Sequence, residues 1–434
     1  MDNQILIYGI TIIATIILSI FLYKKYHLTR YQCLIFILLV LFWSAVNIVR
    51  SYRKAYAMAP VDIGGLALGG TLAANIAAAY GLISTFIRLP VFALSDYFKS
   101  RKALILFAVS AVLVTSVYVV FKPGYYSLLL SSLALGISAS MLSLFNVLFA
   151  ETFDSNQAMM SVSILSVAPL LAEFIMSPIQ YTATKGNIKH YGEMWIVSAV
   201  LSLITLIFLL FVKDNKEPTR NFSLKRFKKV VSDQRLLILS AVGILVSFIK
   251  FSSSGSNLVA FVRLKEIGMS DFLIAYIDFI YSSFQLVAGV LAGLYFKKKI
   301  GIRNTLILGL ALCGIFSLTL TITTNQWVIF FTHALSGFGY GLTYNILIGV
   351  VMEPYAKNVR EMTMGVYQTF FGLGIFFGDK IYAWMIDLLP DGISDYMMHI
   401  DVFTIITVIT FATILLVLYL FRQSNRKFFE NKSY

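Results

Sequence analysis

Residues 31–46 of the chain are YQCLIFILLVLFWSAV, and residues 47–60, NIVRSYRKAYAMAP, follow them directly. The first segment carries no charged residue, while the second brings Arg50, Arg53 and Lys54 onto the continuation of the same apolar helix. A charged side chain near the centre of a membrane helix costs roughly 2.5–3.5 kcal/mol on insertion scales, and such residues usually carry function. The stretch therefore predicts a membrane-spanning helix and a site that uses cations.

The composition extends the membrane prediction to the whole chain. Its 434 residues are 59% hydrophobic and 13% charged, whereas ordinary globular chains are about 25% charged. The mean hydropathy is +0.82. Apolar runs of roughly 20 residues, the length of a membrane-spanning helix, recur along the chain. They predict transmembrane helices at 5–23, 32–58, 70–94, 103–121, 126–150, 159–181, 195–212, 236–261, 272–296, 305–323, 327–352, 363–388 and 402–421.

These helices are arranged as one leading helix followed by two sets of six. The expected fold class is an all-α polytopic membrane protein with two pseudo-symmetric six-helix bundles and one extra N-terminal transmembrane helix. A cleaved signal peptide is the alternative for the leading helix, but its leader MDNQ has no positive charge and no small-residue cleavage site follows it. The expected parts are the extra helix with its basic loop at 1–30, bundles at 31–212 and 236–421, a basic linker at 213–235 and a tail at 422–434.

The basic residues lie mainly in loops on one side of the predicted membrane. Those loops hold 24 of the 35 Lys and Arg residues, and the opposite loops hold five. Cytoplasmic loops carry this excess, which predicts a cytoplasmic C-terminus. The compact twelve-helix core and the absence of organelle signals lead us to expect the bacterial inner membrane. Because the net charge of +14 is spread over short loops, we expect the lipid bilayer as a partner and no nucleic acid.

The two sets of six helices repeat a short motif. ALSDYFKSRKALIL at 93–106 and AGLYFKKKIGIRNTLIL at 292–308 share YFK, a basic cluster and LIL at matching places. Such repeats are typical of secondary transporters. Asp96 followed by Arg101 and Lys102 resembles the helix 2–3 signature of the major facilitator superfamily, with Phe92 and Tyr97 departing from its Gly and Arg. The resemblance implies a gating role for those three residues and covers about 400 residues of architecture.

Ionisable and polar residues inside the predicted helices form the candidate site. We expect Glu173, Asp278 and Asp379 to couple protons or to be counter-ions of Arg50, Lys250 and Lys380. The alternative for Arg50, Arg53, Lys54 and Arg88 is that their side chains snorkel to the membrane surface and bind no substrate. Glycines 337, 339 and 341 are expected to allow close helix packing. The expected substrate-binding residues are Arg50, Arg53, Arg88, Lys250, Tyr344 and Asn345.

An alignment of the two repeats suggests how the cations cooperate. Matching Tyr97 to Tyr295 gives an offset of 198 positions, which places Lys250 between Arg50 and Arg53. Arg and Lys are suited to phosphate or carboxylate. Cations on the first helix of each half therefore predict a clamp for an anion between the halves.

The stretch at 47–60 also resembles one branch of the superfamily, the organophosphate:phosphate antiporters. That branch has an Arg-Lys pair followed by small residues, a Met and a Pro, here Arg53, Lys54, Ala57, Met58 and Pro60. The resemblance implies phosphate contacts for Arg88, at the place of a family Lys, and for Lys250, near the place of a family Arg. The functional His on the branch's fifth helix is absent here, where Glu173 stands instead.

Two functions remain open, and both are secondary transport. The first is alternating-access transport of a small organic anion, in particular a phosphorylated metabolite, in exchange for phosphate. The second is a proton-coupled symporter or efflux pump for another small solute or drug. An enzyme or a sensor is not expected, because no nucleophile–base pair, metal-ligand cluster or large soluble domain is present in the sequence. We expect no cofactor, no metal and a monomer.

Overall fold

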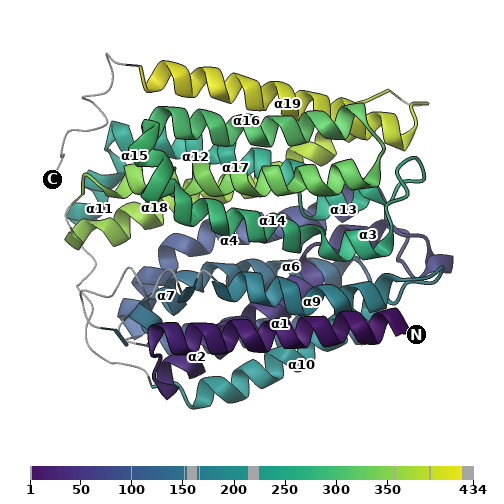
Figure 1. Ribbon diagram of the computed structural model, residues 1–434, viewed down its shortest axis with the longest axis horizontal. Helices are drawn as coiled ribbons and strands as arrows, with labels where there is room; N and C mark the ends of the chain where they lie inside the picture. The colour runs from purple at the N-terminus through teal and green to yellow at the C-terminus, as the bar shows by residue number, and fades with distance from the viewer. Residues whose placement is uncertain are drawn as a thin grey trace. The chain divides into compact units, whose positions relative to one another are not determined.

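The computed structural model describes residues 2–98, 100–150, 152–153, 164–165, 167–213, 224–355, 357–390 and 392–422. Every regular element in these ranges is helical, and the all-α fold class is confirmed. The helices (Figure 1) are α1 Asp2–Tyr26, α2 Arg30–Arg50, α3 Arg53–Met58, η1 Val61–Ile63, α4 Gly70–Phe98, α5 Arg101–Phe121, α6 Tyr125–Ser140, α7 Leu142–Ala150, α9 Val167–Thr184, α10 Tyr191–Leu210, α11 Leu224–Val231, α12 Gln234–Ser253, α13 Ser256–Val262, α14 Asp271–Leu291, η3 Ala292–Phe296, α15 Lys297–Lys299, α16 Gly301–Ile322, α17 Gln326–Met352, α18 Lys357–Asp387 and α19 Asp395–Leu420.

Ten helices in the described ranges are long and apolar enough to cross a membrane. Three predicted spans are not among them. The span at 126–150 is divided at Met141 into α6 and α7. The span at 159–181 starts outside the described residues, and α9 begins at Val167. The third, α18, carries charged residues near both ends as well as Asp379 and Lys380, which lowers its hydropathy. Tyr8–Tyr26 within α1 is one of the ten, and its role as an additional transmembrane helix stays a prediction.

The chain forms two compact units, which we describe separately. Unit 1 comprises Met1–Ile76, Tyr97–Glu217 and Ser270–Phe279, and unit 2 comprises Ala77–Asp96, Pro218–Met269 and Ile280–Tyr434. Two helices contribute to both units: most of α4 belongs to unit 2, and the first nine residues of α14 belong to unit 1.

The first long helix of each predicted bundle is broken, which corrects the expectation of continuous helices at 32–58 and 236–261. Ser51 and Tyr52 separate α2 from α3, and Ser254 and Gly255 separate α12 from α13. Gly255 has a φ of 62°, in the left-handed region that glycine enters without steric cost.

These breaks also correct the alignment of the repeats. The residues that restart the two helices, Arg53 and Ser256, are 203 positions apart. At this offset Lys250 corresponds to Asn47, about one helical turn before Arg50. The expected offset of 198, which placed Lys250 between Arg50 and Arg53, therefore does not hold for the first helices.

In unit 1, α2 packs against α9 and α10, and α5 packs against α6 and α10. The hydroxyl of Tyr8 on α1 donates to the backbone oxygen of Pro178 on α9 at 3.2 Å, so α1 lies beside α9 (Figure 1). Lys102 on α5 donates to the backbone oxygens of Leu210 at 3.1 Å and Val212 at 2.9 Å. A cation that binds the last carbonyls of a helix stabilises that end, so Lys102 caps α10.

In unit 2, α12 packs against α18, and α16 packs against α17 and α19. Glycines 337, 339 and 341 of α17 occur where helices approach closely, as the sequence predicts. A Cβ atom on Gly341 would lie 2.5 Å from the backbone oxygen of Gln285, and one on Gly337 would lie 2.9 Å from the backbone carbonyl carbon of Tyr281. A larger residue at either position would push α17 away from α14.

Candidate substrate-binding and coupling residues

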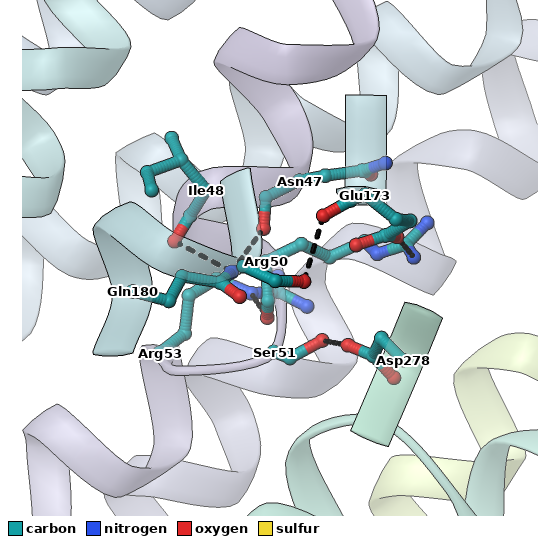
Figure 2. A network of polar contacts seen from close by, with 9 residues as sticks. Asn47, Ile48, Arg50, Ser51, Arg53, Glu173, Gln180 and Asp278 are labelled. Atoms are coloured by element: carbon teal, nitrogen blue, oxygen red, sulfur yellow. Dashed lines mark hydrogen bonds and ion pairs between the residues drawn. The ribbon is translucent and has the colours of Figure 1, made fainter. Parts of the chain in front are cut away.

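A polar cluster surrounds the break between α2 and α3 in unit 1 (Figure 2). Arg50, the last residue of α2, forms an ion pair with Glu173 on α9, with 3.1 Å between Nη2 and Oε1. The side chain of Glu173 is 3% exposed, and that of Arg50 is 22% exposed. Glu173 is thus a counter-ion of Arg50, one of the pairings that the sequence left open.

Arg53 and Lys54 follow the break and are buried, each with 3% of its surface exposed. Arg53 donates from Nε to the backbone oxygen of Arg50 at 2.8 Å and from Nη1 to the Ser132 hydroxyl at 2.9 Å. Because two directional bonds hold the guanidinium inside unit 1, it does not extend along an exposed surface. Snorkelling does not describe these two side chains.

Asp278 and Gln180 complete the cluster. The hydroxyl of Ser51, at the break itself, donates to a carboxylate oxygen of Asp278 on α14. Gln180 on α9 donates to the backbone oxygens of Asn47 at 3.1 Å and Ile48 at 3.2 Å, and so binds carbonyls near the end of α2. Sequence reasoning missed Gln180, although it lies seven residues after Glu173 and therefore on the same face of α9.

Arg88 on α4 occupies a different environment in unit 2. It donates from Nε to the Ser84 hydroxyl at 3.0 Å, and from Nη1 to the backbone oxygen of Gln368 at 3.4 Å and to the side-chain oxygen of Gln368. The side-chain nitrogen of Gln368 in turn donates to the Tyr344 hydroxyl at 2.9 Å. Within the described ranges, every hydrogen-bond partner of Arg88 is neutral, in contrast to Arg50.

Lys250 on α12 lies among aromatic rings of unit 2. Its Nζ is 4.3 Å from the ring centroid of Phe251, 5.0 Å from that of Tyr281 and 5.5 Å from that of Tyr340. A cation within about 6 Å of an aromatic face is attracted by the electron-rich ring. Tyr340 also stacks on Tyr344, with 5.5 Å between centroids. The Tyr344 hydroxyl accepts from Gln368, the partner of Arg88, so Lys250 and Arg88 are both connected to this aromatic group.

Asp379 on α18 binds the second helix break. It accepts hydrogen bonds from the Ser256 hydroxyl at 3.3 Å and the Asn257 side-chain nitrogen at 3.2 Å. Both donors are in the first turn of α13, where backbone and side-chain donors favour an anion. Each break thus has a carboxylate bonded to a serine beside it, Asp278 to Ser51 in unit 1 and Asp379 to Ser256 in unit 2.

The remaining predicted residues are more dispersed. Asn345 is exposed, and its side-chain nitrogen donates to the backbone oxygen of Gly341 at 2.8 Å, within its own helix. Of the gating residues, Arg101 is half-buried at the start of α5 and Lys102 caps α10. Asp96 is in the last turn of α4, and its side chain lies outside what the structure describes. In the described part of the chain, no group of three His, Cys, Asp or Glu residues could hold a metal ion.

Comparison with known proteins identifies the family. Over 213 residues the chain is 25% identical to an uncharacterized MFS-type transporter of Methanocaldococcus jannaschii. The matched region is 46% of this chain and 51% of that protein. The chain therefore spans about half the length of this relative. Three solved structures share the fold. The nucleoside transporter NupG is 15% identical with a TM-score of 0.70, and the match covers 91% of this chain and 100% of that one. A POT family transporter in complex with a thioalcohol-conjugated peptide is 14% identical with a TM-score of 0.72, over 90% of this chain and 96% of that one; a D-xylose-proton symporter is 12% identical with a TM-score of 0.68, over 89% and 96% of the two chains. The model of the Major Facilitator Superfamily matches residues 4–379, and the chain belongs to that superfamily.

Proposed function

We propose that this transporter moves a small organic anion, with a phosphate monoester as the first candidate, by alternating access. The observation that carries the proposal is the number of cations at the break in unit 1. Arg50, Arg53 and Lys54 lie within a stretch of five residues there, and Arg53 and Lys54 are buried. Buried cations in a low-dielectric interior favour an anionic ligand.

The cations of unit 2 support the same choice of substrate. Arg88 has only neutral hydrogen-bond partners in the described ranges, so its charge remains to be balanced by a ligand. Guanidinium groups bind phosphate and carboxylate oxygens in pairs, which a single ammonium does not do. Lys250 adds a second positive charge beside the same aromatic group.

The proposal is tested by uptake of radiolabelled phosphate into proteoliposomes. The vesicles are preloaded with phosphate, glycerol-3-phosphate or glucose-6-phosphate, or left empty. Uptake that requires an internal anion, and that a Lys250→Ala variant loses, supports anion exchange. Absence of phosphate flux under every loading condition refutes the phosphate-exchange form of the proposal.

Proton-coupled symport is the second candidate, and the Arg50–Glu173 pair favours it. Protonation of Glu173 would remove the negative partner of Arg50 and leave the guanidinium free to bind a substrate anion. In this scheme an inward proton gradient drives uptake into empty vesicles. A Glu173→Gln variant, which mimics the protonated acid, should lose the dependence on the gradient but keep exchange between loaded vesicles. If the variant responds to the gradient as the unmodified protein does, Glu173 does not carry the coupling proton.

A further inference from the structure

Gln368 joins Arg88 and Tyr344 of unit 2, and both of these have hydrogen-bond donors that no described residue accepts. The two ends of its side-chain amide hold Arg88 and Tyr344, because the oxygen accepts from Arg88 and the nitrogen donates to the Tyr344 hydroxyl. Since the oxygen and nitrogen of one amide are neighbouring atoms, the guanidinium and the phenol are held close to each other. All three residues are half-buried, so each keeps part of its surface accessible.

Each of these two groups, the guanidinium and the phenol, has a donor that the described part of the protein does not use. In the described ranges, Arg88 uses Nε and Nη1 for protein hydrogen bonds and makes none through Nη2. Nη2 is also absent from the buried polar atoms that lack a partner, so it keeps accessible surface. The Tyr344 hydroxyl accepts from Gln368, and no described residue accepts its proton. An edge of a charged guanidinium and a phenolic O–H therefore point to a ligand with oxygen acceptors.

We infer that Gln368 is the positioning residue of an oxyanion subsite whose ligand-binding groups are Arg88 Nη2 and the Tyr344 hydroxyl. The neutral amide fixes the guanidinium without cancelling its charge. A carboxylate at the same position would fix it equally well but would neutralise it. The buried aromatic rings of Tyr340 and Phe371 lie behind Tyr344, with centroids 5.5 Å and 5.2 Å from its ring, and hold the phenol in place. This inference rests on the proposed function, because it assigns part of the proposed anion site.

The test compares three variants of the full-length protein in detergent. Gln368→Glu places a carboxylate beside Arg88, and Gln368→Met removes both amide bonds while keeping the length of the side chain. Thr369→Asp is the matched control. It adds the same charge at the next position, about 100° around the helix, where the threonine hydroxyl binds only the backbone oxygen of Gly365 among the described residues. Binding of inorganic phosphate and of acetate is measured by titration calorimetry, and the two probes distinguish a phosphate from a carboxylate site.

The expected result is a loss of affinity of at least about tenfold in Gln368→Glu, because an ion pair with the new carboxylate replaces the bond to the ligand. Gln368→Met should bind more weakly than the unmodified protein but more tightly than Gln368→Glu, since Arg88 keeps its charge and loses its orientation. Thr369→Asp should bind as the unmodified protein does. A purely structural role gives the opposite order, with Gln368→Met the more impaired. That order, or equal affinity in all variants, or no binding of either probe to the unmodified protein, overturns the inference.

A second measurement reports directly on the free edge of Arg88. Phenylglyoxal modifies accessible guanidinium groups, and mass spectrometry of the peptides locates the adduct. Arg88 should react, phosphate or acetate should protect it, and Arg235, which is 2% exposed, should not react. Absence of a reaction at Arg88, or reaction that neither anion slows, contradicts the subsite. Neither experiment requires transport, so a protein that binds the probes but moves no anion would refute the proposed function and leave the subsite in place.

Discussion

The ion pair between Arg50 and Glu173 makes a prediction about stability that does not depend on the substrate. With 3.1 Å between Nη2 and Oε1 and an effective dielectric constant of about 20, Coulomb's law gives an attraction of roughly 5 kcal/mol. The loss of hydration of both groups offsets part of this attraction. Double-mutant cycles on contacting residue pairs give coupling energies of about 0.5–3 kcal/mol. Because Glu173 is 3% and Arg50 22% exposed, we expect a coupling energy near the upper end, at about 2 kcal/mol.

The variants are Glu173→Gln, Arg50→Gln and the double variant. Glu173→Gln keeps the shape and an acceptor oxygen but leaves the charge of Arg50 without its carboxylate, so the free energy of unfolding should fall by about 2–3 kcal/mol. The double variant has neither charge and should be less destabilised than the two single variants added together. Unfolding is followed in mixed micelles with increasing SDS, and a helical circular dichroism spectrum and a single size-exclusion peak confirm that the variants are folded.

A matched control comes from an exposed pair in the same unit. Glu193 lies 3.4 Å from His190, and their side chains are 60% and 56% exposed. Water screens such a pair, so Glu193→Gln should leave the free energy of unfolding unchanged within error. A loss below about 0.5 kcal/mol in Glu173→Gln, or a cycle with no coupling, would refute the reasoning. The pair would then be a solvated contact and could not act as a switch.

Two further predictions concern unit 2. Gly337→Ala should destabilise the protein by about 1–3 kcal/mol, because its Cβ would overlap the backbone of Tyr281. Gly349→Ala on the same helix should not destabilise it, because a Cβ there meets nothing within 4 Å. Equal melting temperatures of the two variants would contradict the close packing. Asp379→Ala should cost about 1–3 kcal/mol in detergent unfolding because Asn257 loses an acceptor, whereas Asp379→Asn should retain most of the stability; equal losses would show that the hydrogen bonds contribute nothing.

The membrane-spanning helices could be predicted because length and hydropathy decide them locally. An apolar run of roughly 20 residues must satisfy its own backbone in lipid, and a helix does this within one segment. The break after Arg50 could not be predicted, since Ser51 and Tyr52 do not disfavour a helix strongly. The break at Gly255 had a visible signal in its glycine, but a glycine inside an apolar helix is common in membranes and does not by itself mark an end.

The candidate site divides in the same way. The chemistry of Arg50, Glu173 and Lys250 is visible in the sequence because charge inside an apolar run stands out. The partners are not visible, because each depends on how helices distant in the chain pack together. Arg50 and Glu173 are 123 positions apart, and Arg88 and Gln368 are 280 apart. A glutamine also carries no charge, so nothing in the sequence marks Gln368 as the partner of a cation.

Arg50 and Arg88 differ in their hydrogen-bond partners in a way that assigns them separate tasks. Arg50 is paired with a carboxylate, so an anion that approaches it competes with Glu173 and gains only the difference between two similar interactions. Arg88 is held by neutral groups, so an anion gains the full charge-assisted bond without displacing an acid. Under the proposed function, affinity for the anion therefore resides mainly at Arg88, while Arg50 responds to the protonation of Glu173. Arg88→Gln should then weaken anion binding at every pH, whereas Arg50→Gln should chiefly alter the dependence of transport on the proton gradient.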